Sequence, residues 1–382
     1  MVSSFMFRPV HIEAAAAKGK PCADLDCLFI SRKEKRAIAM SDTAPFAPES
    51  GSPSSVLPTE RPRRYVFLLL ERFTMISFAA AIEPLRLANQ LSRKTHYSWK
   101  LVGEGFRDGH GIARCSNGTA LAIDSGLEEG SREDTILVCG GLHVAQATTR
   151  PILAWLRREA RRGARIGALC TGTWTLAEAG LLHGRRATIH WENQDGLAEK
   201  FPDIEMIRSV FVEDGNILTA AGGTAAIDLM LRQISRDQGS DLAARVADQM
   251  IHTSIRTEDD HQRLSIPTRI GVRHPRLATI VARMEGNLED PISPAQLAAD
   301  AGISPRQLER LFARYLGRSP KRYYMEIRLE RARNLLLQTD MSVIEIALAC
   351  GFASAAHFSK CYRASYGTTP YRQRGTQEPA AL

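Results

Sequence analysis

The sequence predicts a three-layer α/β domain with a mainly parallel sheet, followed by an all-α domain with two helix-turn-helix motifs. Between residues 65 and 237, apolar strand patterns alternate with helix patterns, the order expected of a parallel sheet covered by helices. Between residues 276 and 374, one pattern of two helices joined by a glycine turn occurs twice. The segment 238–275 begins as a helix and then becomes polar and proline-broken, so we expect a helix and linker there.

The chain begins with a segment, residues 1–60, that we expect to be disordered. Its later part is rich in Pro, Ser and acidic residues and lacks the apolar residues of a core. Met40 stands just before that part. One hypothesis is therefore that the protein starts at Met40, and the other is a real but unfolded N-terminal tail. Residues 375–382 are expected to form a second disordered tail.

A continuous apolar run begins at Tyr65, and such a run is typical of a buried parallel strand. Later strands are expected in YSWKLVG, TILVCGG, RIGAL, ATIHW and NILTAAGG. Helices are expected over 77–91, despite Pro84, and over 150–163, GTWTLAEAGLL and TAAIDLMLRQI.

Cys170 stands between a predicted strand and a predicted helix, the arrangement of a nucleophile elbow. The helix dipole would favour a thiolate there. Gly141 ends a neighbouring strand, whose backbone N–H groups are suited to an anion pocket, and His190 ends the next strand. These residues are expected to meet at the carboxyl edge of the sheet.

Residues 65–237 resemble the class I glutamine amidotransferase-like, or PfpI-like, domain. The matching residues are Gly140, Gly141, Ala168, Cys170, Gly172, Leu176, Ala177, Gly180, Leu181, Leu182, Gly184, His190 and Asp228. In enzymes of that family the cysteine works with a histidine and an acidic residue, which implies Cys170 as nucleophile and His190 as its partner. Thr171 replaces the histidine of PfpI-type proteases, and Ser77 falls where the acidic residue is expected. We therefore expect no enzyme activity, with Cys170 and His190 as vestigial candidates; an active Cys-dependent hydrolase or amidotransferase is the alternative.

Two tryptophans and a carboxylate follow the elbow closely enough to hold a cationic amine. The predicted ligand-binding residues are Gly141, Cys170, Trp174, His190, Trp191 and Glu192. The competing interpretation makes the two tryptophans core residues. A third hypothesis is a dimerisation module without a ligand.

The two C-terminal copies carry matching start signals for their second helices. Ser304 is a suitable N-cap, Pro305 suits the first helical position, and Gln307 completes a capping box. Ser354 opens the second copy. The apolar spacing turns several residues outward, and the second helix of such a motif lies in the major groove of DNA. The predicted DNA contacts are Arg306, Glu309, Arg310, Arg314, Lys321, Arg322, Ala355, Ala356, Ser359, Lys360 and Arg363.

This region resembles the DNA-binding domain of the AraC/XylS family of transcription regulators. The first copy matches through Ala298, Gly302, Leu308, Leu311, Phe312, Gly317 and Pro320, and the second through Ile346, Ala347, Cys350, Gly351, Phe352, Ser354, Phe358, Gly367 and Pro370. A PfpI-like domain before it resembles a subfamily that senses small nitrogenous metabolites such as amino acids, betaines or carnitine. The resemblance implies double-stranded DNA, a small-molecule effector and RNA polymerase as partners of an activator, and a homodimer formed through the α/β domain.

Charge and cysteine usage agree with these expectations. Residues 269–382 hold 17 Lys and Arg against 10 Asp and Glu, so nearly all of the net charge of +8 lies with the double motif. The seven cysteines form no Cys-x-x-Cys pair, and no histidines have zinc spacing, so we expect no metal or cofactor and a reducing cytoplasm. Apolar runs of membrane-spanning length are absent from the sequence.

Overall fold

The computed structural model describes residues 61–263, 265–272, 274–339 and 341–375. The predicted tail 1–60, the alternative start at Met40 and residues 376–382 lie outside the described residues. Gly375, predicted to belong to the second tail, is the last residue of a helix.

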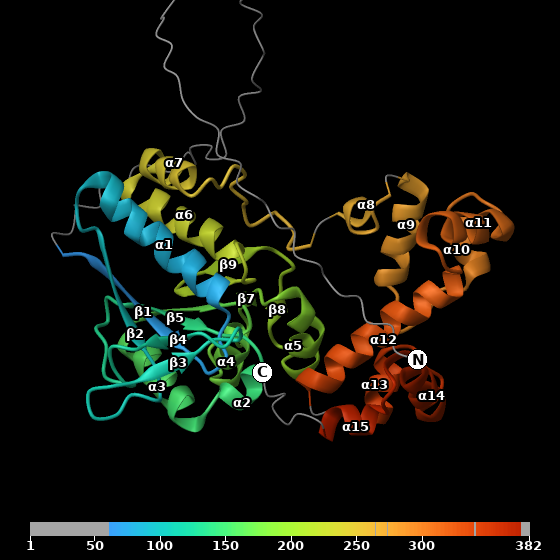
Figure 1. The fold of residues 1–382 in the computed structure, drawn as a ribbon, viewed down its shortest axis with the longest axis horizontal. Helices are drawn as coiled ribbons and strands as arrows, with labels where there is room; N and C mark the ends of the chain where they lie inside the picture. The colour runs from blue at the N-terminus through green and yellow to red at the C-terminus, as the bar shows by residue number, and fades with distance from the viewer. Residues whose placement is uncertain (1–60, 264, 273, 340, 376–382) are drawn as a thin grey trace, which may run out of the picture. The chain divides into compact units, whose positions relative to one another are not determined.

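The first domain is built on a six-stranded sheet that is parallel except at one edge (Figure 1). Its order is β2 (Tyr97–Val102), β1 (Arg63–Leu69), β5 (Thr135–Cys139), β6 (Arg165–Leu169), β10 (Ile217–Ala220) and β9 (Phe211–Asp214), with β9 antiparallel to β10. Two small sheets pair β3 (Ile112–Arg114) with β4 (Ala120–Ala122) and β7 (Arg186–Ala187) with β8 (Glu205–Met206). The predicted mainly parallel sheet is confirmed.

Helices cover both faces of this sheet, which gives the predicted three layers (Figure 1). One face carries α1 (Met75–Ser92), α6 (Ala225–Gln238) and α7 (Ser240–Gln249). The other carries α2 (Val144–Ala147), α3 (Arg150–Arg162), α4 (Gly172–Glu178) and α5 (Gln194–Lys200). Strand β1 shows why both faces need cover: Phe67 packs into the first core and Leu68 into the second, because successive side chains of a strand point to opposite faces.

Several elements are shorter than the sequence predicts, and two of them lie next to the elbow in sequence or structure. The strand expected over ATIHW is confined to Arg186–Ala187, because the Thr188 N–H donates to the Thr219 hydroxyl and Trp191 opens a 3₁₀ turn, η1 (Trp191–Asn193). The helix expected over GTWTLAEAGLL ends at Glu178, before Gly180 adopts a φ of 71°. The polypeptide from Thr188 to His190 therefore runs as an irregular segment, which Thr173 of α4 contacts through the Thr188 carbonyl.

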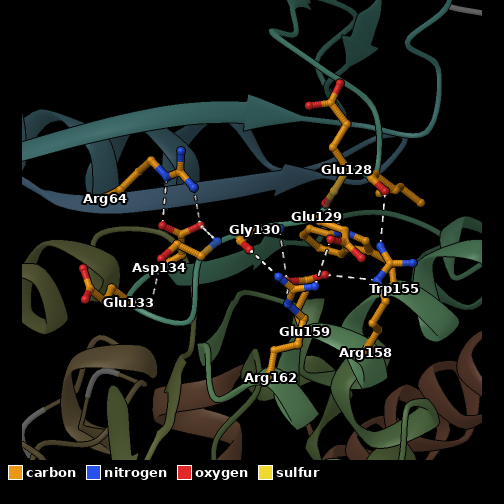
Figure 2. A network of polar contacts seen from close by, with 12 residues as sticks. Arg64, Glu128, Glu129, Gly130, Glu133, Asp134, Trp155, Arg158, Glu159 and Arg162 are labelled. Carbon is orange, nitrogen blue, oxygen red and sulfur yellow. Dashed lines mark hydrogen bonds and ion pairs between the residues drawn. The ribbon is translucent and has the colours of Figure 1, made fainter.

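A network of buried carboxylates fixes the loop before β5 to β1 and α3 (Figure 2). Asp134 accepts two hydrogen bonds from the Arg64 guanidinium, at 2.8 and 2.6 Å. Glu159, whose side chain is fully buried, accepts from the Gly130 N–H at 3.1 Å and from Arg158 Nε at 3.2 Å. Buried carboxylates need such partners. This network lies near the amino ends of β1 and β5, whereas Cys139 ends β5 and Cys170 follows the end of β6, so its role is structural.

The segment predicted as helix and linker is mostly attached to one domain or the other. Helix α7 packs into the core under α1 and α6 through Leu242, Ala243, Val246 and Ala247. Residues 252–263 bond to the α/β domain, as described below. Helix α8 (Ile266–Arg269) packs with α9 (Pro275–Glu285) in the core of the helical domain. Polar composition alone did not indicate these attachments.

The second domain is all helical, as predicted, and contains α10 (Pro294–Asp300), α11 (Pro305–Leu316), α12 (Pro320–Gln338), α13 (Val343–Ala349), α14 (Ala355–Tyr366) and α15 (Pro370–Gly375). Helices α10 and α11 form the first helix-turn-helix, and α13 and α14 form the second. Helix α12 joins them. Within the described residues no helix is long and apolar enough to cross a membrane.

Both motifs are held by the caps and glycines that the sequence contains. The Ser304 hydroxyl accepts from the Gln307 N–H at 3.2 Å, while the Gln307 side chain accepts from the Ser304 N–H at 2.8 Å, which is the predicted capping box. Ser354 accepts from the His357 N–H at 3.2 Å. Leu308 and Phe312 of α11, and Phe358 and Tyr362 of α14, are fully or almost fully buried. Each such side chain contributes roughly 1.5–3 kcal/mol to the folded state.

Helix α12 also fixes the second motif directly. The Arg328 guanidinium donates to the Cys350 carbonyl at 2.7 Å and to the Gly351 carbonyl, and it lies 4.3 Å from the centre of the Phe352 ring. Gly351 has a φ of 71°, and a Cβ there would lie 2.6 Å from the carbonyl oxygens of Leu288 and Glu289. The turn of the second motif therefore packs against the loop that precedes the first.

Candidate functional site

Cys170 occupies the strained turn between β6 and α4. Its φ is 59°, a left-handed conformation that costs a residue with a Cβ about 1–2 kcal/mol. Close glycines make room for the turn: a Cβ on Gly172 would lie 2.2 Å from the Val138 carbonyl, and one on Gly222 would lie 2.7 Å from Cys170 Cβ. The predicted elbow is therefore present in its backbone geometry.

Hydroxyl groups surround the thiol. Thr74 Oγ1 lies 3.7 Å from Cys170 Sγ, and the polar groups of Ser77 and the Thr171 backbone also lower the pKa of the thiol. Thr74 is the N-cap residue of α1, but its hydroxyl caps no backbone N–H because it faces the sulfur. Ser77 is 1% exposed and accepts from the Gly223 N–H at 2.9 Å.

These surroundings reverse the expected ionisation of the cysteine. Burial raises the pKa of the Cys170 thiol above its ordinary value, and the hydrogen bonds from Thr74, Thr171 and Ser77 offset this only in part. The helix dipole expected to favour a thiolate comes from α4, which has only 7 residues. The desolvation cost of the thiolate is therefore the larger effect, and the neutral thiol is the favoured form.

His190 and Cys170 line one pocket, but no hydrogen bond joins them in the described part of the chain. His190 Nδ1 instead lies 3.7 Å from a carboxylate oxygen of Glu192. Burial lowers the pKa of His190, although the charge of Glu192 opposes the shift, so the imidazole is neutral near pH 7. A neutral imidazole that does not touch the thiol is not positioned to deprotonate it.

Thr171, the residue after the cysteine, has a structural role. Its hydroxyl donates to the Gly141 carbonyl at 2.7 Å, which ties the elbow to the end of β5. Gly140, beside Gly141, donates its N–H to the Leu169 carbonyl at 3.1 Å. That N–H is therefore not available to an anion, contrary to the expectation for the glycine pair.

The two tryptophans lie in different surroundings. Trp174 is 1% exposed and packs edge-on against Phe201, with Lys200 Nζ 5.1 Å from its ring centre. Its indole nitrogen has no hydrogen-bond partner among the described residues. Trp174 also lines the Cys170 pocket, with Thr74, Gly141, His190 and Glu192. It is therefore both a core residue and part of the pocket wall.

Trp191 is the predicted ligand residue that does not line this pocket. The guanidinium of Arg263 covers its ring, with Cζ 4.4 Å from the ring centre. The sequence predicts a ligand cation over this aromatic face, but the cation that lies there belongs to the chain itself. The expected strand ends at Ala187, and a 3₁₀ turn begins at Trp191, so no strand carries the side chain to the elbow.

Most of the predicted DNA contacts are exposed to solvent. The exposed residues are Arg306, Glu309, Arg310 and Arg314 on α11, Lys321 and Arg322 on α12, and Ala356, Lys360 and Arg363 on α14. Ala355 and Ser359 are half-buried. Arg322 pairs with Glu326 at 3.1 Å. Arg310 and Lys360 have no ion-pair partner within the described residues, so their charges are available to a partner.

Sequence reasoning missed several residues that the structure brings to the site. Thr74 carried no signal, and Ser77 was noted only as the place of a missing carboxylate. Arg256 and Gln262 lie in the polar stretch interpreted as a linker. Only their side-chain contacts, which the sequence does not contain, identify them.

Comparison with known proteins follows the same division of the chain. Residues 66–236 match the family described as "DJ-1/PfpI family", and residues 297–375 match "Helix-turn-helix domain". The HTH-type transcriptional regulator GbdR of Pseudomonas aeruginosa is 45% identical over 316 residues, which are 83% of this chain and 85% of that protein. The HTH-type transcriptional regulator GlxA of Rhizobium meliloti is 39% identical over 309 residues, covering 81% and 94%.

Among solved structures, an AraC family transcriptional regulator from Pseudomonas putida is 31% identical. It covers 50% of this chain and 100% of its own, with a TM-score of 0.44. The two domain matches and the nearly full-length relatives show the family of this protein. The chain belongs to the AraC/XylS family of transcriptional regulators, as a member whose first domain is of the DJ-1/PfpI type.

Proposed function

We propose that the α/β domain is a sensor without enzyme activity, and that a small nitrogenous metabolite of the amino acid, betaine or carnitine type binds in the Cys170 pocket. The bound effector then controls the DNA-binding domain. The observation that carries this proposal is the environment of the thiol. Two hydroxyls stand beside it in place of a carboxylate and an imidazole, and burial holds its pKa above the ordinary value.

The pocket wall supports a ligand with a positive group. Glu192 contributes the carboxylate, since its side chain is 51% exposed and its neighbour His190 is neutral. Thr74 and Cys170 add small polar groups, and Gly141 also lines the pocket. Trp191 leaves the predicted ligand set because Arg263 covers its ring. A cation paired with Glu192 near a wall of Trp174 would be partly desolvated, which strengthens the attraction.

The alternative is a Cys-dependent hydrolase or amidotransferase tethered to DNA. The strained φ of 59° at Cys170 favours it, because enzymes keep nucleophiles in such turns. The two proposals differ in one measurement. A sensor hydrolyses amides no faster with Cys170 than with Cys170→Ser, whereas an enzyme loses its turnover in that variant.

The helical domain is proposed to read two adjacent major-groove segments from one chain. Helices α11 and α14 carry the base-reading residues, led by Arg310 and Lys360. Lys321 and Arg322 follow Pro320 at the start of α12, where a helix N-terminus also favours phosphate. Activation through RNA polymerase and a homodimer formed through the α/β domain complete the proposal, by analogy with the family.

A thermal-shift screen of amino acids, betaines and carnitine on the full chain tests the sensor. A ligand that binds only the folded state raises the melting temperature by mass action. The effect should vanish in Cys170→Trp, whose indole obstructs the pocket beside the elbow, while binding of that variant to DNA remains. If no nitrogenous metabolite shifted the melting temperature, the sensor proposal would be wrong.

A further inference from the structure

The segment that leaves the α/β domain is attached to it by side chains along its whole length. We call residues 252–263 the strap. It contains no helix or strand, and the helical domain begins after it with α8 at Ile266. It starts at a strained turn, since Ile251 has a φ of 56° although it is β-branched and 84% exposed. Such strain persists only where surrounding contacts hold it.

The first attachment is Asp228 in the first turn of α6. Its side chain is fully buried and accepts from His252 Nε2 at 2.8 Å, from the Arg256 N–H at 2.8 Å and from Arg256 Nε at 2.9 Å. The Arg256 guanidinium also donates to the Thr224 hydroxyl at 2.8 Å. A buried carboxylate that accepts from a guanidinium makes strong bonds, and removal of that guanidinium leaves an uncompensated charge.

The second attachment is Gln262. Its Nε2 lies 2.9 Å from three acceptors: the Thr188 hydroxyl, the Ile189 carbonyl and the Ser209 carbonyl. The Val210 N–H donates to the Asp260 carbonyl at 3.0 Å, so the strap also extends the backbone bonding there. Beyond Gln262, Arg263 covers the Trp191 ring. The end of the strap is therefore fixed to the irregular segment that carries His190.

Each attachment lies one or two contacts from the Cys170 pocket. Thr224, which binds Arg256, follows Gly223, whose N–H donates to the Ser77 hydroxyl beside the thiol. On the other side, Thr173 of α4 donates to the Thr188 carbonyl at 2.8 Å, and Thr188 binds Gln262. A ligand that moved the elbow helix or the glycine turn would therefore disturb the strap.

We propose that the strap couples the Cys170 pocket to the DNA-binding domain. Occupation of the pocket changes the free energy of the strap's attachment at Arg256 and Gln262. Because coupling between two sites is reciprocal, a change in that attachment changes the free energy of ligand binding in the pocket by the same amount. This inference rests on the proposed sensor function for its biological meaning. The coupling between the strap and the pocket does not itself depend on an effector.

The first test therefore uses the full chain without a ligand. Gln262→Ala removes the second attachment, and Asn89→Ala is the matched control, since Asn89 is also half-buried and makes three hydrogen bonds far from the strap. Amide hydrogen exchange is followed at residues 170–173 and 222–224. We expect about fivefold faster exchange there in Gln262→Ala and none of this in Asn89→Ala. Unchanged exchange at the pocket in Gln262→Ala would overturn the proposal.

The second test uses the betaine, carnitine or amino acid that raises the melting temperature. Its Kd should change by about fivefold or more in Gln262→Ala and in Arg256→Gln, and stay constant in Asn89→Ala. A probe that bound all variants equally would refute the coupling while leaving the sensor proposal intact. If no probe bound the wild type, the sensor proposal would fall, and the exchange experiment would still decide the coupling.

Discussion

The turn glycines of the two helix-turn-helix motifs occupy equivalent positions but have different neighbours, which allows a matched experiment. Gly302 has a φ of 63°, and a Cβ there would meet nothing within 4 Å. Gly351 has a φ of 71°, and a Cβ there would lie 2.6 to 2.7 Å from two carbonyl oxygens and from the Pro291 ring. None of these atoms belongs to a flexible side chain, so the backbone itself must shift.

The expected costs follow from these surroundings. Alanine in a left-handed conformation costs about 1–2 kcal/mol, which should be the whole effect of Gly302→Ala. Gly351→Ala adds an overpacking cost of about 1–3 kcal/mol, so it should destabilise the helical domain by about 2–5 kcal/mol. It should also weaken DNA binding more, because the second motif is pushed away from residues 288–291.

Urea unfolding of the full chain measures the loss of unfolding free energy in each variant. Hydrogen exchange on peptides of the helical domain is used to monitor the unfolding. Fluorescence anisotropy with a labelled duplex measures DNA affinity. Equal destabilisation by the two substitutions would refute the packing of the second turn against the first motif. A larger effect of Gly302→Ala would contradict the assignment of that packing altogether.

Three further predictions concern the α/β domain and the buried thiols. Cys170→Ser should leave DNA affinity and amide hydrolysis unchanged, and a loss of turnover in a peptide or amide assay would support an enzyme instead. Ile251→Gly should stabilise the chain by about 0.5–1 kcal/mol in urea unfolding, because relief of the left-handed strain exceeds the added chain entropy; destabilisation would show that the side chain has a further role. Burial raises the pKa of Cys350 to about 12 and that of Cys139 further, so the neutral thiols stabilise the fold below the unfolded pKa of about 8.5. That contribution is lost as the pH rises toward the folded values, by up to about 1.4 kcal/mol per pH unit for each group, and a constant urea midpoint between about pH 8 and 10 would contradict it.

Local signals predicted the helical domain well because its structure depends on short-range contacts. The capping box at Ser304 and Gln307 and the buried positions Leu308 and Phe312 involve residues only a few positions apart. The alternation of strands and helices gave the layers of the first domain for the same reason. These features lie within reach of periodicity and capping rules.

The Cys170 pocket depends on contacts between distant residues, and there the sequence was less informative. The apolar pattern of ATIHW predicts a strand, but Thr188 bonds to Thr219 and the strand stops. The tryptophan at 191 looks available to a ligand until Arg263, far along the chain, covers it. A dipole argument favoured a thiolate at Cys170, and burial outweighed it. Burial and long-range partners are not encoded in local spacing.

The most direct test of the account is whether α11 and α14 of one chain read two different DNA segments. Selection from random duplexes with the wild-type chain supplies the site. Affinities are then measured on single-base variants of that duplex, at several salt concentrations, for Arg310→Ala, Lys360→Ala and Lys321→Ala.

We expect Arg310→Ala to lose about 1–3 kcal/mol of discrimination at one or two base pairs of one segment, and Lys360→Ala to do so in the other segment. Lys321→Ala should weaken binding evenly on every sequence and reduce the salt slope by about 1. If all three substitutions changed affinity by the same factor on every duplex, neither helix would be a reader of bases, and the central claim would be contradicted.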